Sequence, residues 1–73
     1  MAVDKRPAER ELKKKMLTRL WHQRDLEAYR RKGDAAGEER CELALKLDDA
    51  LIRSHCAEHG LKLPHDVPPE DAA

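Results

Sequence analysis

Residues 30–39 read RRKGDAAGEE, and this stretch decides the fold. Gly33 is suited to the left-handed backbone conformation that ends a helix, and Asp34 can cap the start of a second helix directly afterwards. Helical patterns extend from this point in both directions along the chain. Because a connection of one or two residues makes two helices antiparallel, the sequence predicts an all-α fold, an antiparallel helical hairpin. We expect its helices to cover about residues 5–32 and 35–59.

The outer ends of the two helices carry their own boundary signals. Asp4 can cap the first helix, whose opening turn tolerates Pro7. Gly60 suits the end of the second helix, and Pro64 follows shortly after it. The last ten residues include three prolines and little that could be buried. We therefore predict a hairpin domain over residues 1–63 and a flexible, Pro- and acid-containing tail over residues 64–73.

The composition excludes several classes of protein. The chain has 73 residues, enough for one small domain, and 41% of them are charged. Its longest apolar runs are three residues, whereas a membrane-spanning helix needs about 20 and a signal peptide about 7–15. Cys41 and Cys56 would lie too far apart on one helix to form a disulfide, as is typical of a reducing compartment. We therefore expect a cytoplasmic protein with no membrane partner.

Motifs of enzyme and cofactor sites are missing from the sequence. It has no glycine-rich phosphate loop, no CxxC pair and no HExxH sequence. Thr18 and Ser54 are its only aliphatic hydroxyl residues, which argues against a serine-nucleophile enzyme. We therefore expect a non-enzymatic protein with no cofactor and no small-molecule substrate.

The second helix would be apolar around most of its circumference. Its apolar residues are Cys41, Leu43, Ala44, Leu45, Leu47, Ala50, Leu51, Ile52, Cys56 and Ala57. One partner helix covers only part of such a surface, and a chain this short has little core to spare. A second copy of the chain would cover the rest in a four-helix bundle made from two hairpins. We therefore predict a homodimer whose core contains Leu45, Leu51, Ile52 and Cys56.

Charge is divided between the two halves of the chain. Residues 1–32 hold 11 basic and 5 acidic residues, a net charge of +6, and residues 33–73 hold 4 basic and 10 acidic residues, a net charge of −6. Opposite charges can guide helix pairing within the hairpin and across a dimer. The first helix can also offer a cationic face to an anionic partner, and both interpretations stay open.

One side of the first helix combines basic residues with large apolar ones. As a protein-binding surface, this side would use Leu17, Trp21 and Arg24 as anchors, and the protein would be an adaptor, a cochaperone or a regulator. Alternatively, the same side could bind RNA through phosphate pairing and base stacking. The residues for RNA binding would be Arg6, Arg10, Lys13 and Trp21.

A further alternative is a metal site near the end of the second helix. His55 and His59 are four residues apart, so they can lie on one side of a helix beside Cys56. His59 would also lie in the last helical turn, where the helix dipole favours a cation. Asp48 falls on the apolar side of the same helix, where we expect it to fix the helix register or to pair with an arginine of the first helix.

Part of the second helix resembles a known family. The residues that carry the resemblance are Cys41-Glu42, Asp49, Leu51, Arg53-Ser54, Ala57 and Gly60. Over residues 41–60 the chain resembles the second helix of Rop-like proteins, which regulate plasmid copy number. The resemblance implies a hairpin that dimerises into an antiparallel four-helix bundle and binds paired RNA loops with its first helices. It places the RNA-binding face at Arg6, Lys13, Leu17 and Trp21, but an aromatic residue is missing at Leu17 and a basic one at Ala28.

Overall fold

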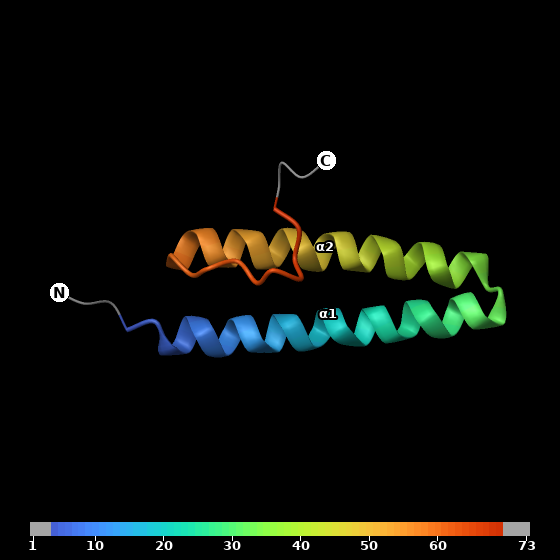
Figure 1. The fold of residues 1–73 in the computed structure, drawn as a ribbon, viewed down its shortest axis with the longest axis horizontal. Helices are drawn as coiled ribbons and strands as arrows, with labels where there is room; N and C mark the ends of the chain where they lie inside the picture. The colour runs from blue at the N-terminus through green and yellow to red at the C-terminus, as the bar shows by residue number, and fades with distance from the viewer. Residues whose placement is uncertain (1–3, 70–73) are drawn as a thin grey trace.

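The structure, a computed structural model, describes residues 4–69 and consists of two helices in an antiparallel hairpin (Figure 1). Helix α1 is Arg6–Lys32 and helix α2 is Ala35–His59. They lie side by side in a body that measures 53 × 25 × 16 Å. Over the described residues, neither helix has the length and hydrophobicity needed to cross a membrane. The all-α hairpin predicted from residues 30–39 is therefore confirmed.

The turn between the helices forms through local hydrogen bonds. Gly33 adopts the left-handed conformation, with φ of 71°, and its N–H donates to the carbonyl of Arg30. The Asp34 carboxylate accepts a hydrogen bond of 3.0 Å from the N–H of Gly37 and so caps α2. These bonds satisfy backbone groups that the ends of the two helices would otherwise leave without partners.

The start of α1 differs from the prediction. Lys5, not Asp4, is the N-cap residue, and no side chain caps the helix there. The Asp4 carboxylate instead accepts hydrogen bonds from the backbone N–H and the Nε of Arg6, each at 3.0 Å. The side-chain bond from Arg6, and then the backbone bond, lower the pKa of Asp4. Pro7 lies in the first turn, where its missing N–H costs no helical hydrogen bond.

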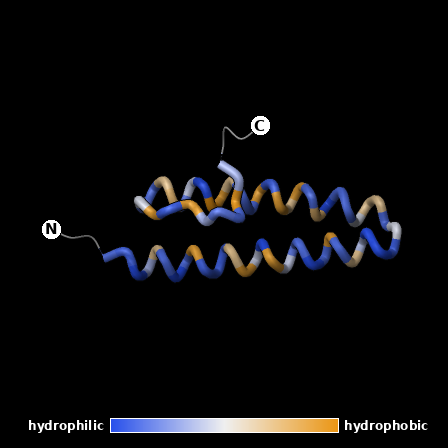
Figure 2. The backbone as a smooth tube through the Cα atoms, in the orientation of Figure 1, coloured by the Kyte–Doolittle hydropathy of each residue, from blue (hydrophilic) through white to orange (hydrophobic). Residues whose placement is uncertain are grey.

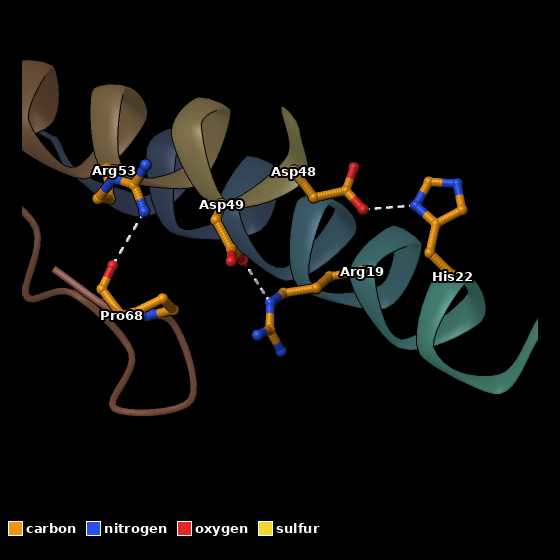
Figure 3. A network of polar contacts seen from close by, with 6 residues as sticks. All are labelled: Arg19, His22, Asp48, Asp49, Arg53 and Pro68. Atoms are coloured by element: carbon orange, nitrogen blue, oxygen red, sulfur yellow. Dashed lines mark hydrogen bonds and ion pairs between the residues drawn. The ribbon is translucent and has the colours of Figure 1, made fainter. Parts of the chain in front are cut away.

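Polar contacts cross the seam between the two helices (Figure 3). Arg19 Nε donates to the Asp49 carboxylate at 2.6 Å, and both side chains are largely buried. One turn further along α1, His22 Nδ1 contacts the carboxylate of the buried Asp48. Because the helices are antiparallel, these two contacts define their register, in which Arg19 lies level with Asp49.

After α2, the chain turns back and lies against the hairpin (Figure 1). Gly60 ends α2 in the left-handed conformation, with φ of 63°. We call residues 61–69 the C-terminal strap. Its Val67 is 1% exposed and packs against Ile52 and Cys56 of α2. Partly buried residues complete this core cluster, namely Leu12 and Met16 of α1 and Leu61 and Leu63 of the strap.

The strap is also held by backbone acceptors. The N–H of Val67 donates to the carbonyl of Pro64 at 3.0 Å, which closes a turn. Arg53 of α2 donates to the carbonyl of Pro68 at 3.0 Å (Figure 3). Figure 2 shows the apolar positions of the strap and of the helices beside it. The strap therefore joins the hairpin core through one deeply buried side chain and a small set of polar contacts.

The strap bears on two predictions. The tail over residues 64–73 was expected to bury little, but Val67 is a core residue; residues 70–73 lie outside the described residues. Ile52 and Cys56 were expected in a dimer core, but they are buried within the single chain. The physical reason is that the strap brings an apolar side chain back over the flank of α2 that α1 covers only in part.

Candidate functional site

Leu17 and Trp21 lie on the outer side of α1, away from α2. Leu17 precedes the buried Leu26 by nine residues, about two and a half helical turns, so the two side chains point in opposite directions. Trp21 follows Leu17 by about one turn. The two residues are 54% and 57% exposed. Large apolar side chains that stay in water on one side of a helix form a candidate binding surface.

Basic residues share this outer side of α1. Arg24 follows Trp21 by three residues and is exposed, and so are Arg6, Arg10 and Lys13 in the preceding turns. We call this surface, formed by Arg6, Arg10, Lys13, Leu17, Trp21 and Arg24, the outer α1 face. It contains every residue that the sequence suggested for protein or RNA binding. Its charge is positive, so it suits an anionic partner.

A second exposed apolar surface runs along α2. Leu43, Leu47 and Leu51 are 59%, 61% and 49% exposed, and their spacing of four residues places them on one side of the helix. We call them the α2 leucine stripe. As predicted, α1 does not cover the whole apolar surface of α2 in the single chain, because these three leucines stay exposed. Of the four residues expected in a dimer core, Leu51 is exposed, whereas Leu45 is partly buried.

The place of Leu45 explains this difference. It lies in a groove between the helices, where it is accompanied by Leu20, Gln23 and Leu26 of α1. The groove has a volume of about 430 Å³. Leu45, Ile52 and Cys56 thus line the flank of α2 that faces α1 and the strap, and the leucine stripe lies on the opposite flank. Sequence periodicity groups residues by flank, but it does not say which flank a wide apolar helix turns inward.

Asp48 pairs with His22 and not with an arginine of α1, which was one of the two roles predicted for it. Its carboxylate contacts His22 Nδ1, while the arginine nearest along α1, Arg19, binds the adjacent Asp49. The register of the helices decides this choice, because Arg19 lies level with Asp49. A buried carboxylate needs a partner, so the contact between Asp48 and His22 favours this register over one shifted by a turn.

His55, Cys56 and His59 do not assemble into a metal site. His55 Nε2 lies 2.7 Å from the carbonyl oxygen of Ala8, which ties α2 to the start of α1. The Cys56 thiol lies 3.9 Å from the carbonyl oxygen of Lys62 in the strap. Within residues 4–69, no three His, Cys, Asp or Glu side chains are grouped so that they could hold a metal ion. His55 therefore acts as a hydrogen-bonding group and Cys56 as a packing group, while His59 is exposed.

The two cysteines are buried free thiols. Burial raises the pKa of the Cys56 thiol, because an apolar environment disfavours the charged thiolate. Since the thiolate is the reactive form, a neutral and inaccessible thiol reacts slowly. Cys56 thus behaves as a small apolar core residue.

No protein-family model, curated protein or solved structure matches this chain. The resemblance of residues 41–60 to Rop-like hairpins therefore stays a prediction. The two exposed surfaces, the outer α1 face and the α2 leucine stripe, are the features from which a function can be inferred.

Proposed function

We propose that this protein is a non-enzymatic protein-interaction module, a homodimeric helical hairpin that binds another protein through its outer α1 face. The observation that carries the proposal is the exposure of Leu17 and Trp21, one turn apart on the side of α1 turned away from α2. Tryptophan is enriched among the residues that dominate binding energy at protein interfaces. Such a module would serve as an adaptor, a cochaperone or a regulator in the cytoplasm.

The chemistry of the outer α1 face suggests the kind of partner. Arg10, Lys13 and Arg24 are exposed and each lies within about two turns of Leu17. A partner helix with apolar side chains one turn apart and acidic residues beside them would match both features. The opposite charges would speed the encounter and orient the helices, and burial of the apolar side chains would supply most of the affinity. The proposed partner is therefore an acidic amphipathic helix.

RNA is a second candidate, because Trp21 is exposed among arginines and lysines. Those side chains could pair with phosphates while the indole ring stacks on a base. Two features of the face favour protein. Trp21 is the single tryptophan of the chain, and Leu17 beside it has no flat ring on which a base could stack. An aliphatic side chain next to an indole is better suited to the apolar face of a helix.

The test compares Trp21→Ala with Glu27→Ala, an exposed position of the same helix. Both variants should fold like the wild type, since neither side chain is buried. Proteins captured by the wild type should be lost with Trp21→Ala and kept with Glu27→Ala, and binding of a purified captured protein should shift the Trp21 emission to the blue. An unchanged set of partners with Trp21→Ala would contradict the proposal. RNA binding that weakens steeply between about 50 and 200 mM salt would support the second candidate instead.

A further inference from the structure

The hairpin has two broad sides, and the C-terminal strap lies over one of them toward the open end of the hairpin (Figure 1). On the strap side, Asp66 lies beside Lys13 and Met16 of α1. On the other side, the leucine stripe meets α1 at a hollow of about 240 Å³, where Leu51 lies near Thr18. We call this second side the open side. It runs along both helices, which lie side by side (Figure 1).

Four exposed charges mark the corners of the open side. On α1, Lys14 and Asp25 flank Thr18, four residues before and seven residues after it, so the three share one side of the helix. On α2, Arg40 and Glu58 flank the leucine stripe. Lys14 and Glu58 lie toward the open end of the hairpin, and Asp25 and Arg40 lie toward the turn. Charges of opposite sign therefore alternate around the open side.

These four charges are available to a partner. All four residues are exposed, and within residues 4–69 none of their side chains forms an ion pair with its own chain. An alternating set of this kind becomes self-complementary when a second copy is turned over onto it, because each positive corner then meets a negative one. The open side thus has the charge pattern of a contact between two identical chains.

The positions along α2 show how the copies would be aligned. Arg40 and Glu58 are each nine residues from Asp49, on opposite sides of it, and Leu47 and Leu51 are each two residues from it. A two-fold axis that crosses the helices at Asp49 would therefore bring Arg40 opposite Glu58 of the partner subunit. The same axis would bring Leu47 opposite Leu51 of the partner subunit, beside the hollow next to Leu51.

The positions along α1 agree with this axis. Arg19 lies level with Asp49, and Lys14 and Asp25 are five and six residues from Arg19 on opposite sides. The axis that pairs Arg40 with Glu58 would therefore also bring Lys14 close to Asp25 of the partner subunit. The charges on both helices and the leucines of α2 are therefore all matched by the same two-fold axis, which crosses the helices at Asp49.

We infer that the open side is the contact face of the homodimer, with α1 antiparallel to α1 and α2 antiparallel to α2 of the partner subunit. The inference rests on the dimer of the proposed function and names its face and register. A two-fold axis along the helices would also pair opposite charges, but it would set the leucine stripe against Thr18 and Asp25 of the partner's α1. An axis across the helices sets leucine against leucine, which buries more apolar surface. In this dimer Leu17 and the basic residues of the outer α1 face stay accessible, while Trp21, three residues after Thr18 and four before Asp25, lies at the edge of the contact.

The experiment is sedimentation equilibrium on the full chain and on exposed-residue variants, with circular dichroism to confirm that each variant is folded. The wild type should be dimeric at micromolar concentration, and Leu47→Glu should be monomeric. Arg40→Glu should raise the dimer Kd about ten-fold or more, since the symmetric dimer loses the attraction twice and gains repulsion twice. Adding Glu58→Arg to Arg40→Glu should restore the Kd to within about three-fold of the wild type.

The matched control adds Asp25→Lys to Arg40→Glu, which should leave the dimer weak. Rescue by Asp25→Lys instead of Glu58→Arg would overturn the orientation in favour of the axis along the helices. A dimer that tolerates both Leu47→Glu and Arg40→Glu would overturn the contact face, while the dimer of the proposed function would stand. A wild-type chain that stays monomeric at all concentrations would overturn the dimer itself and the inference with it.

Discussion

The strap can be tested by replacing its one deeply buried side chain. Val67 is 1% exposed and packs against Ile52 and Cys56, so Val67→Ala would leave a space in the core without changing the helices. We expect this variant to be markedly less stable than the wild type, although residue 67 lies outside both helices. The same result would show that the strap is part of the cooperative fold and not an appendage that unfolds separately.

The size of the effect follows from the groups removed. Val67→Ala deletes two methyl groups from a fully buried site, at about 0.8 kcal/mol per buried carbon, and a residual cavity adds to this loss. We expect a loss of about 2 kcal/mol in the free energy of unfolding. A domain of this size has a total stability of about 4–11 kcal/mol, so the loss is a large fraction of it. It corresponds to a decrease in Tm of about 8–16 °C.

The measurement is urea unfolding followed by helical circular dichroism, with wild type and variant at the same protein concentration because the proposed dimer would also stabilise the fold. The matched control is His65→Ala in the same strap, whose side chain is 97% exposed and whose loss should change stability by less than about 0.5 kcal/mol. If Val67→Ala unfolds at the same urea concentration as His65→Ala, the strap contributes nothing to the core and the reasoning is refuted.

Other perturbations test the seam and the core. Gly37→Ala should destabilise the protein by about 1 kcal/mol, because a Cβ there would lie 2.6 Å from Cγ of the Tyr29 ring and this overpacking outweighs the gain in helix propensity. In a Tyr29→Ala background the same change should stabilise the protein, and a loss there would refute the steric explanation. Asp48→Ala should cost about 1–3 kcal/mol in chemical unfolding by leaving His22 without its buried partner. The double variant His22→Leu/Asp48→Leu should return to within about 1 kcal/mol of the wild type, and equal losses in both variants would argue against the pair. Since burial raises the pKa of Cys56 above 9.0, the stability from its neutral thiol is fully present below pH 9 and is lost as the pH rises through the raised pKa. Cys56→Ala should therefore lose less stability than the wild type between about pH 7 and about pH 10, and parallel pH profiles would contradict this.

The hairpin itself could be predicted because its causes are local. Gly33 ends α1 and Asp34 caps α2 through bonds to residues no more than four positions away. Backbone preferences of this kind are visible in a few consecutive letters, so residues 30–39 were enough to specify two antiparallel helices. The start of α1 shows the limit of such reasoning. Asp4 has the right residue type for a cap, but its carboxylate binds Arg6 instead. The predicted cap at Asp4 and the observed N-cap at Lys5 differ by one residue.

The candidate surfaces could be predicted in part. The outer α1 face was visible as a pattern of Leu17 and Trp21 among basic residues, but a pattern is compatible with a buried tryptophan as well as an exposed one. Exposure depends on which side of α1 meets α2, and the buried Ala8 and Leu26 show that it is the side opposite Leu17. The spacing of four residues also predicted the α2 leucine stripe as one apolar flank of the helix. The sequence did not tell which of the two apolar flanks of α2 would be buried in the core.

The sequence by itself determined the two helices, the turn between them and the excess of apolar surface on α2, because each of these depends on neighbouring residues or on helical periodicity. Only the tertiary structure decided which flank of α2 is covered. That choice depends on a contact between Ile52 and Val67, which are fifteen residues apart, and on the reversal of the chain at Gly60 between them. Periodicity carries no information about such a contact, so the strap, and with it the side left open for a partner, became visible only in three dimensions.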